Sequence, residues 1–538
     1  MDLWDYIVVG AGSAGCVIAE RLSADGRSRV LVLEAGDEDR SPWIAIPKGI
    51  AKLVTNPKHI WTYQVSQPRS GGGPANEIWI RGKGLGGSSS INGMIWSRGE
   101  PADYDEWEAL GCTGWNGASM TRAFQQLEDH GLGAGGRRGI GGPVHIAPHL
   151  YSYPLAEKMI EAGEAMGLER AEELNDLDGD RVGLYSHNIR RGRRQSASVT
   201  HLRPARQRYN VRVVTHAVAE RILVENQRAC GVAVKVHGVP QTFQCSGEII
   251  LCGGLLESPL LLQRSGIGPA EYLRAIGVPP IVNIPDVGAK MREHLSYAMP
   301  FRLKEPIGIS ASFYGFGLFK AMLRYAFTRS GVMATGPFEV GAFANLTNPD
   351  GRPDAQFYLS AYTFALGDAN HPVPLNMIDR QPGLSIYGQL LRLTSEGSIR
   401  ITGHSTGDAP DIRPNWLSTS EDRQAAIAMM RFMRSYMEQP PLRPLIASEL
   451  LPGASCTSDE DLLHSFRKLS TSGLHGIGTC RMGGDSRSVT DPQLRVRNIG
   501  GLRVADCSVM PAPVTGNTNA PAMALGLRAA ELILVDRP

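Results

Sequence analysis

Residues 5–15 read DYIVVGAGSAG, and this stretch decides how the start of the chain folds. The aromatic and β-branched run before Gly10 is typical of a buried parallel strand. Gly10, Gly12 and Gly15 then follow in the spacing of a dinucleotide-binding turn. The first glycine permits a tight turn, the second lets the backbone approach a pyrophosphate, and the third lets a helix pack on the strand. We therefore expect a nucleotide-binding strand, turn and helix over residues 5–22.

A second buried strand is predicted at residues 30–34, which read VLVLE. Glu34, at its end, is placed to accept hydrogen bonds from a ribose hydroxyl, and its charge would repel a 2′-phosphate, which disfavours NADP. A glycine motif alone is weak in a chain with 62 glycines, where it could be a surface turn. Here the strand, glycines, helix, strand and acid occur in the required order. The motif does not separate FAD from NAD.

Length and composition exclude several classes of protein. A chain of 538 residues is long enough for two domains rather than one. A net charge of +2 gives no reason to expect a nucleic-acid partner. The eight cysteines lack the paired spacing of metal ligands, so we expect no metal site. They fit a reduced, cytoplasmic protein better than a disulfide framework.

Nothing in the sequence predicts membrane insertion. No charged and apolar leader precedes the first strand, so we expect no signal peptide. No uncharged apolar stretch reaches about 18–20 residues, the length that spans a bilayer. Residues 311–327 are rich in aromatic side chains with a few cations. We interpret them as a lid or wall over an apolar substrate cavity rather than a membrane contact. Residues 190–194, RRGRR, are interpreted as a solvated loop rather than a functional patch.

The middle of the first half contains a long glycine- and serine-rich loop. Residues 80–99 read IRGKGLGGSSSINGMIWSRG, which offers many backbone amides and three consecutive serine hydroxyls in little volume. Such a loop suits the wrapping of a phosphate and a flat ring. The interleaved Ile, Met and Trp residues favour a packed loop over a flexible linker.

Further strands and one more glycine turn are predicted later in the chain. Residues 211–215, 248–252 and 502–506 have the pattern of buried strands, and residues 253–268 that of a glycine turn and a helix. Asp506 ends the last of these strands. It could accept a hydrogen bond from the sugar chain of a cofactor, or it could cap a helix; both interpretations stay open.

Two short motifs near the C-terminus carry polar groups suited to catalysis. Residues 475–483 read HGIGTCRMG and residues 517–521 read NTNAP. Together with the nucleotide-binding start of the chain, they suggest one redox active site assembled from the two ends.

Five blocks spread over nearly the whole chain carry a family resemblance. They are the GAGSAG turn with Glu34, GGSSSINGM, ESPLLLQRSGIG, HGIGTCRMG, and GLRVADCSVMP followed by NTNAPAMALGLRAAELIL. The chain resembles the glucose-methanol-choline (GMC) oxidoreductases, a family of FAD enzymes that oxidise alcohols. It is most similar in character to the choline-dehydrogenase-like, aryl-alcohol oxidase and hydroxymethylfurfural oxidase branches.

The resemblance implies a role for each matching residue. The glycine turn and Glu34 would hold the ADP half of FAD, the serine-rich loop its pyrophosphate and isoalloxazine, and Ala219 its adenine through the backbone. Asp506 and the amides near Thr518 would complete the flavin site. His475 would be the catalytic base and Asn517 its partner. The implied cofactor-binding residues are Gly10, Gly12, Ser13, Ala14, Gly15, Glu34, Gly87, Ser88, Asn92, Gly93, Met94, Ala219, Asp506 and Thr518.

The chemistry of the pair supports these implied roles. Moving a hydride from an alcohol carbon to flavin N5 requires the hydroxyl proton to leave, and an imidazole of near-neutral pKa suits its acceptance. An amide beside the imidazole can orient the hydroxyl without titrating.

Three departures limit what the resemblance implies. Ile91 stands where some members have a histidine bonded to the flavin, so we expect non-covalent FAD. Leu255 replaces the usual small residue, which affects local packing more than function. Residues 297–470 match only loosely, so substrate specificity stays open.

The implied fold class is α/β (α+β overall), with a discontinuous Rossmann-like FAD-binding domain at residues 1–150, 197–296 and 483–538. A substrate-binding domain at residues 151–196 and 297–482 would be built on a largely antiparallel sheet. Within it, residues 383–393 and 397–402 alternate as half-buried strands do. Side chains weighed as site residues, but expected to be ordinary core or structural pairs, are Phe338, Glu339, Tyr358 and Tyr387.

The function predicted is the FAD-dependent oxidation of a primary alcohol, aromatic or otherwise apolar, to an aldehyde, with the proton passing to His475. A choline, polyol or sugar dehydrogenase is the alternative within the family. A flavin-containing lyase, a photodecarboxylase or an NAD-binding protein are alternatives of other classes. The sequence leaves open whether oxygen or a quinone- or dye-like compound accepts the electrons, and it leaves the oligomeric state open.

Overall fold

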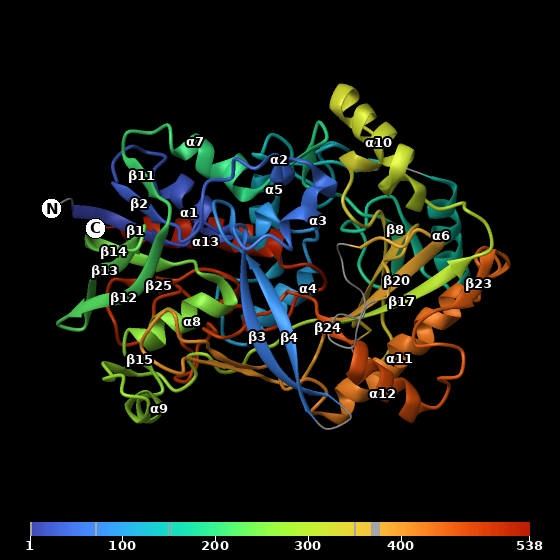
Figure 1. Ribbon diagram of the computed structural model, residues 1–538. Helices are drawn as coiled ribbons and strands as arrows, with labels where there is room; N and C mark the ends of the chain where they lie inside the picture. The colour runs from blue at the N-terminus through green and yellow to red at the C-terminus, as the bar shows by residue number, and fades with distance from the viewer. Residues whose placement is uncertain are drawn as a thin grey trace.

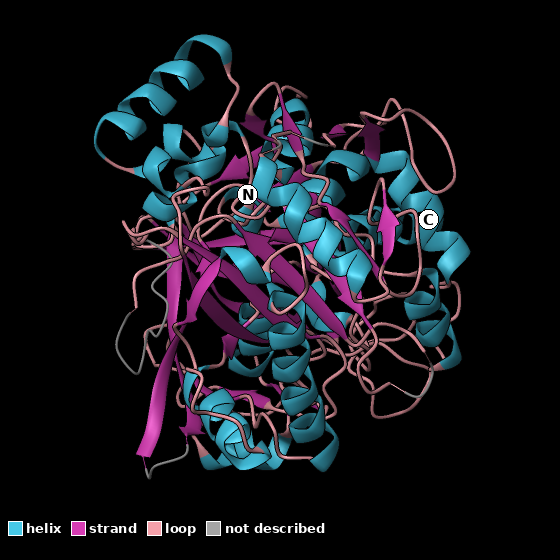
Figure 2. Ribbon diagram, turned by 90° about the vertical axis from the view of Figure 1, so that its right-hand side faces the viewer, coloured by secondary structure: helices cyan, strands magenta, loops and turns pink. Residues whose placement is uncertain are grey.

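The computed structural model describes residues 3–69, 73–148, 150–151, 153–348, 351–366 and 377–537. Two large sheets lie side by side, the first on the left of Figure 1 with both chain ends and the second on the right. Strands run through the middle of the molecule and helices lie around them (Figure 2). This mixed α/β architecture confirms the predicted fold class.

The first sheet is built on the strand that precedes the glycine turn. β1 (Leu3–Val9) pairs in parallel with β2 (Val30–Leu33) and with β14 (Val239–Leu251). The strand order is β11-β2-β1-β14-β13-β12, and β25 also pairs with β14. The pairs of β13 are antiparallel, whereas β11 and β25 pair in parallel. The remaining strands are β11 (Val211–Val214), β12 (Ala217–Glu225), β13 (Arg228–Val236) and β25 (Leu502–Val504).

Helices from the two ends of the chain pack together against this sheet. α1 (Ser13–Leu22) follows the glycine turn directly, and α13 (Asn519–Val535) lies beside it. A side chain at Gly526 would place its Cβ 2.8 Å from the carbonyl oxygen of Ala14, so only glycine allows this approach. The C-terminal motifs are therefore brought to the nucleotide-binding turn, as the sequence predicts.

The second sheet is largely antiparallel, as expected. Its order is β23-β17-β20-β19-β18-β8-β7, with β24 also paired to β17. Among the strand pairs of this sheet within the described residues, only β7–β8 is parallel. The strands are β7 (Glu169–Ala171), β8 (Arg181–Leu184), β17 (Leu295–Leu303), β18 (Val340–Ala344), β19 (Ala355–Ser360), β20 (Gly383–Leu390), β23 (Ile446–Glu449) and β24 (Thr471–Ser472).

One strand of this sheet differs from its predicted burial. β20 was expected to be half-buried, but all of its residues are buried. The methionines of α11 (Ser420–Met437) cover one face, and a Cβ at Gly388 would lie 2.7 Å from the sulfurs of Met429 and Met433. On the other face, Tyr387 and Gln389 line an internal cavity. The strand β21 (Ser398–Arg400) alternates in burial as predicted.

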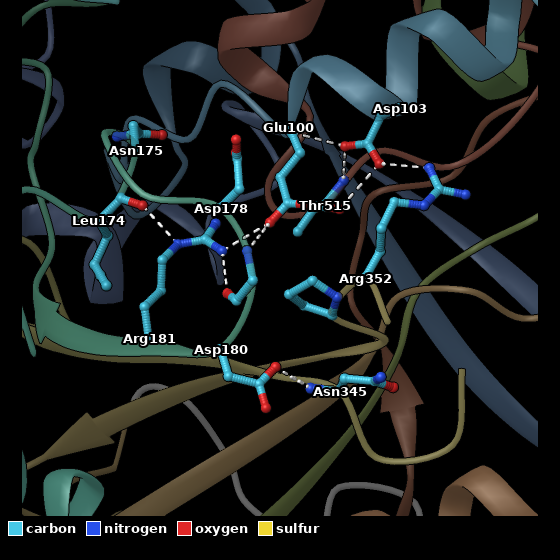
Figure 3. A network of polar contacts seen from close by, with 12 residues as sticks. Glu100, Asp103, Leu174, Asn175, Asp178, Asp180, Arg181, Asn345, Arg352 and Thr515 are labelled. Carbon is cyan, nitrogen blue, oxygen red and sulfur yellow. Dashed lines mark hydrogen bonds and ion pairs between the residues drawn. The ribbon is translucent and has the colours of Figure 1, made fainter. Parts of the chain in front are cut away.

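Buried ion pairs connect the second sheet to the segment that leads into α13 (Figure 3). Arg181 on β8 pairs with Glu100 at 2.8 Å, and both side chains are 3% exposed. Asp103, one turn further on in α4 (Pro101–Ala109), accepts hydrogen bonds from the Thr515 amide at 2.6 Å and the Thr515 hydroxyl at 3.0 Å. Arg392 donates to the same carboxylate at 2.6 Å. These contacts fix the chain two residues before Asn517.

The other elements surround the two sheets. Within the described ranges, none of the helices has both the length and the apolar composition that crossing a bilayer requires. All eight cysteines are free thiols. The larger remaining elements are α2 (Pro42–Ala45), α3 (Ile50–Leu53), β3 (Ile60–Arg69), β4 (Gly73–Gly82), α5 (Gly117–Leu127), α6 (Pro154–Ala165), α8 (Gly254–Arg264), α9 (Ala270–Ala275), α10 (Gly315–Thr328) and α12 (Asp459–Leu469).

Candidate active site

A cavity of about 1470 Å³ extends between the two sheets, from the glycine turn to His475. It is larger than the roughly 300–1000 Å³ that holds one small ligand, so it has room for a cofactor and a substrate together. All the catalytic and cofactor-binding residues predicted from the sequence, except Gly15, line it. These are Gly10, Gly12, Ser13, Ala14, Glu34, Gly87, Ser88, Asn92, Gly93, Met94, Ala219, His475, Asp506, Asn517 and Thr518.

The glycine turn forms a cradle at one end of the cavity. Gly10 has a φ of +105°, and a Cβ there would lie 2.5 Å from the Cys252 carbonyl oxygen. A Cβ on Gly12 would meet no atom closer than 3.8 Å, so any side chain there would occupy the cavity itself. Gly15 does not line the cavity. Its lack of a Cβ lets α1 pack closely on Gly10, because an added Cβ would lie 2.0 Å from the Gly10 carbonyl oxygen. The first turn of α1 carries no acidic residue and no capping side chain, so its amides suit an anion.

Two buried carboxylates fix the turns around this cradle. Glu34 accepts hydrogen bonds from the amides of Ala11 at 2.9 Å, Gly36 at 2.8 Å and Gly84 at 3.1 Å. Burial raises the pKa of Glu34, and these three amides oppose that shift. Glu34 thus joins the glycine turn to the start of the serine-rich loop while it lines the cavity.

Asp506 has the capping role that the sequence left open. It accepts hydrogen bonds from the Ser508 amide at 2.8 Å, the Gly254 amide at 2.8 Å and the Ser258 hydroxyl at 2.6 Å. The last two partners hold the N-terminal turn of α8 against the end of β25. Asp506 also lines the cavity, so contact with a cofactor is compatible with this cap.

The serine-rich loop is held by an arginine that the sequence analysis assigned to a solvated loop. Arg190, Arg191 and Arg193 are exposed as expected, but Arg194 is 2% exposed. Its guanidinium donates to the backbone and side-chain oxygens of Asn92, both at 2.7 Å. Burial lowers the pKa of Arg194 to about 9. The RRGRR composition hides this role because nothing in it distinguishes one arginine from its neighbours.

His475 lies at the opposite end of the cavity with polar groups on both ring nitrogens. The Asn517 Nδ2 lies 3.1 Å from Nε2, which places the predicted pair in contact. The Gln389 Nε2 lies 3.1 Å from Nδ1, and the His294 Nδ1 lies 3.3 Å from the same atom. Burial and then the charge of Arg81 lower the pKa of His475 to about 3, so the imidazole is neutral at ordinary pH.

Asn517 is oriented by a chain of buried amides and phenols. Its Oδ1 accepts from the Gln356 Nε2 at 3.2 Å, and its Nδ2 donates to the Tyr358 hydroxyl at 3.1 Å. These two contacts distinguish the oxygen of the amide from the nitrogen and turn the nitrogen toward His475. The Tyr358 hydroxyl in turn lies 2.8 Å from the Gln356 Oε1 and 2.6 Å from the Gln389 Oε1.

Glu293 supports the backbone of His475 from behind the cavity wall. Its carboxylate accepts a hydrogen bond from the His475 amide at 2.5 Å and pairs with Arg81 at 3.4 Å. Burial raises the pKa of Glu293 to about 7, with the charge of Arg81 opposing the shift. Neither Glu293 nor His294 belongs to a motif that the sequence analysis used, and only the fold brings them to His475.

Aromatic side chains form much of the cavity wall near His475. Phe338, Tyr358 and Tyr387 line it. They belong to the core of the second sheet or pack against it, as expected, and they also form the cavity wall, which was the less expected of the two roles. Tyr358 and Tyr387 are buried and Phe338 is partly buried, and the second sheet turns its inner face toward the cavity. Glu339 is a structural pair as expected, with its Oε1 3.2 Å from Lys48. Leu255 also lines the cavity and fills the space beside Gly476, where a Cβ would lie 2.2 Å from its Cδ2.

Comparison with known families agrees with this arrangement. The family model described as GMC oxidoreductase matches residues 4–296, and its C-terminal counterpart matches residues 394–526. The chain belongs to the GMC oxidoreductases. The region between the two matches contains α10 and the strands β18, β19 and β20. A loose resemblance was expected over residues 297–470, but the C-terminal family model matches the part from residue 394 onward.

Individual GMC relatives extend over almost the whole chain. The alcohol dehydrogenase [acceptor] of Pseudomonas putida is 34% identical, over 99% of this chain and 96% of that protein. The oxygen-dependent choline dehydrogenase of Rhizobium johnstonii is 32% identical, over 99% and 96%. The crystal structure of pyridoxine 4-oxidase from Mesorbium loti superposes with a TM-score of 0.89 at 30% identity, over 99% and 100%. The protein is therefore an oxidoreductase that acts on CH–OH groups.

Proposed function

We propose that this GMC oxidoreductase uses non-covalent FAD to oxidise a primary alcohol, aromatic or otherwise apolar, to its aldehyde. The observation that carries the proposal is the neutral, half-buried His475, whose Nε2 faces Asn517 at the end of the cavity opposite the glycine cradle. We also propose that the two sheets belong to the FAD-binding and substrate-binding domains expected from the sequence, and that the protein is cytoplasmic.

The residues present fit FAD. The open cradle at Gly12 and the uncapped start of α1 suit the pyrophosphate, Glu34 and Ala219 lie where the adenosine part would bind, and the loop at residues 87–94 would hold the ring. When bound, FAD supplies the acceptor for the hydride that leaves the alcohol carbon. Ile91 has no group that could bond to the flavin, which supports non-covalent binding.

His475 acts as the general base in this proposal. Because burial keeps its imidazole neutral, a lone pair is present on the ring before the alcohol arrives. Asn517 can hold the alcohol oxygen beside Nε2 without changing charge. As the ring gains positive charge, groups around Nδ1 stabilise it only if they present an acceptor.

Gln389 can present that acceptor. The Tyr358 hydroxyl has one proton and cannot serve the oxygens of both Gln356 and Gln389. The oxygen and nitrogen of an amide are assigned from their hydrogen bonds. All the contacts of Tyr358 are satisfied when the Gln389 oxygen faces His475 Nδ1 and the Gln389 nitrogen faces the Tyr358 hydroxyl. Nδ1 then carries the proton and donates it to Gln389, which leaves Nε2 as the basic atom.

The wall chemistry supports an apolar alcohol. Phe338, Phe364 and Tyr387 line the cavity together with Tyr358 and Met333. Each carboxylate that lines the cavity already has protein partners. Glu257 pairs with Arg264 at 3.0 Å and accepts from the Tyr63 hydroxyl at 2.8 Å, and Glu77 accepts from the Ser472 amide at 2.8 Å. Glu34 and Asp506 accept from backbone amides. Choline is the second candidate because of the choline dehydrogenase relative. The lyase and photodecarboxylase alternatives gain no support from the reported relatives, which are dehydrogenases and an oxidase.

The test is the visible spectrum of the FAD-loaded protein mixed anaerobically with benzyl alcohol or choline. Bleaching of the flavin band by benzyl alcohol in the wild type, and slower bleaching by at least about 100-fold in His475→Ala, is expected for loss of a general base. His464→Ala, on the exposed face of α12, is the matched control and should bleach like the wild type. Bleaching by choline but not by benzyl alcohol would show that the substrate is a choline-like alcohol rather than an apolar one. Equally fast bleaching in His475→Ala would show that His475 is not the general base.

The same preparation tests the remaining parts of the proposal. Re-oxidation in air, compared with re-oxidation by a quinone or dye without oxygen, distinguishes an oxidase from a dehydrogenase. Acid precipitation should release the yellow cofactor into the supernatant, whereas a covalently bound flavin would stay in the pellet.

A further inference from the structure

Helix α10 presents an apolar stripe to solvent and projects from the body of the molecule (Figure 1). The stripe consists of Phe316, Phe319, Leu323 and Phe327, with exposed fractions of 79%, 61%, 46% and 81%. Spacings of three and four residues place these side chains on one face of the helix. The rings of Phe316 and Phe319 lie against each other with centroids 6.2 Å apart. Contiguous exposed apolar patches of this kind mark interaction sites.

The opposite face of the same helix is packed on the protein. Leu318 and Met322 line the active-site cavity. Tyr325 is buried, and its hydroxyl donates to the Gly192 carbonyl at 2.9 Å. This inner face fits the lid or wall expected from the sequence. The exposed stripe is a second apolar face, which a lid does not need.

The charges beside the stripe all have one sign. Residues 306–338 contain three cations, Lys320, Arg324 and Arg329, and no acidic residue. At the C-terminal end of α10, Arg329 lines a surface hollow together with Arg190, Arg191 and Arg193. In the portion of the chain that the structure describes, none of these six side chains makes an ion pair. The apolar stripe thus lies within a positively charged surface.

We propose that α10 docks on an anionic membrane surface, with the phenylalanine stripe at the level of the headgroups and the cations facing them. A helix with aromatic side chains on one face and cations beside them binds anionic bilayers in this way. A second copy of the chain is a poorer partner for the patch, because a two-fold contact would place the cations of α10 against their own copies. The sequence pattern favoured a lid over a membrane contact, whereas the exposed fractions give the lid role to the inner face and the membrane contact to the outer face.

Docking through α10 would also affect how the substrate reaches the active site; this consequence rests on the proposed function. Because Leu318 and Met322 line the cavity beneath the stripe, docking would bring the cavity wall close to the bilayer. Apolar alcohols partition into the bilayer, so a docked enzyme could take its substrate from the lipid phase.

The experiment is sedimentation of the FAD-loaded, full-length protein with vesicles. Vesicles of phosphatidylcholine alone are compared with vesicles that also contain phosphatidylglycerol. We expect binding to the anionic vesicles only, weaker at 1 M salt, where the Debye length falls to about 3 Å. The variant F316S/F319S/F327S should lose this binding. The variant K320Q/R324Q/R329Q should lose about 100-fold in partitioning, corresponding to about 1 kcal/mol per cation.

A matched control removes three exposed apolar side chains from other surfaces, as I140S/V239S/I281S, and should bind like the wild type. Absence of vesicle binding by the wild type, or equal binding by F316S/F319S/F327S, would overturn the proposal. Self-association of the wild type that F316S/F319S/F327S abolishes, without vesicle binding, would assign the stripe to a second copy. Flavin bleaching by water-soluble benzyl alcohol should be unchanged in F316S/F319S/F327S, so failure of docking and failure of the proposed function are separable.

Discussion

At the scale of residues, the state of His475 depends on side chains that come from distant parts of the chain. Asn517 faces one ring nitrogen, and Gln389 and His294 face the other. The motifs predicted His475 and Asn517. They could not predict Gln389 or His294, because these lie in strands and turns whose local sequence is that of ordinary core. Contact arises only when β17 and β20 pair and turn one face toward the cavity.

Gln389→Leu should lower kcat by about 10- to 100-fold with little change in KM. The substitution removes the acceptor that stabilises a developing imidazolium, an interaction made mainly in the transition state. Such a loss corresponds to about 1.4–2.8 kcal/mol, the range of a buried hydrogen bond to a charged group. The measurement is steady-state kinetics with benzyl alcohol. Gln241→Leu, at an exposed position on β14, is the control, and a rise in KM alone would argue against the assigned role.

Glu293 should control the pH dependence of activity. Because the pKa of His475 is lowered to about 3 and that of Glu293 is raised to about 7, Glu293 is the group of the two that titrates near neutrality. Its ionised form pairs with Arg81 and holds the His475 amide, so kcat/KM should rise between pH 6 and 8. In Glu293→Gln this rise should be absent. A rise of the same midpoint in the variant would show that another group titrates.

The same carboxyl predicts the sign of a stability change. The folded-state pKa of Glu293 lies above the value of about 4.3 for an unfolded chain, so its protonated form stabilises the fold at low pH. That contribution is lost as pH rises through about 7. The thermal midpoint of the wild type should therefore fall more between pH 5 and 8 than that of Glu293→Gln. A larger fall in the variant would contradict the raised pKa.

At the scale of elements, the sequence predicted most where one backbone geometry is required. The strand, glycine turn and helix at residues 3–22 follow the motif closely because the turn leaves no space for a side chain at Gly10 or Gly15. Burial was harder to predict. β20 alternates in sequence but is buried on both faces, since α11 covers it from a segment that follows later in the chain. Arg194 was misassigned for the same reason, because its partners at Asn92 lie on a separate loop.

Gly10→Ala should abolish flavin retention. The added Cβ would lie 2.5 Å from the Cys252 carbonyl oxygen at a φ of +105°, so either β1 or the turn after β14 must move. The measurement is the ratio of flavin to protein absorbance after gel filtration, together with the thermal midpoint. Gly167→Ala is the matched control, because it has a φ of +90° but no atom within 4 Å of the added Cβ. It should lose only about 1 kcal/mol of stability and keep its flavin; equal loss of flavin in both variants would assign the effect to backbone strain.

At the scale of the whole molecule, the cavity is enclosed by two sheets and two buried cores. One core contains the first sheet with α1 and α13, and the other contains the second sheet with α11. The sequence predicted the fold class of both sheets and the nucleotide-binding end of the cavity. It could not predict the aromatic wall near His475, because the chemistry of that wall depends on which face of the second sheet lies inward.

Removal of FAD should lower the stability of both cores together. A ligand that contacts both sheets and binds only the folded chain stabilises it by about 2.7 kcal/mol at 100 times its dissociation constant. The thermal midpoint should therefore rise with added FAD in a single transition. The measurement is differential scanning calorimetry of the stripped and reloaded protein. Two transitions, of which only the one belonging to the first sheet responds to FAD, would show that the cavity is not shared.

The packing of α13 against α1 also has a consequence for biosynthesis. The Ser13 hydroxyl donates to the Asn519 side chain at 2.9 Å, and β25 completes the first sheet beside β14. β1 can pair with β2 soon after both are synthesised. However, α1 leaves the ribosome almost an entire chain before α13 does, so the face of α1 that α13 covers must stay exposed throughout synthesis. Only after translation of residues 502–535 can the cofactor be enclosed. Chaperone protection during translation, and flavin loading after release, follow from this late closure.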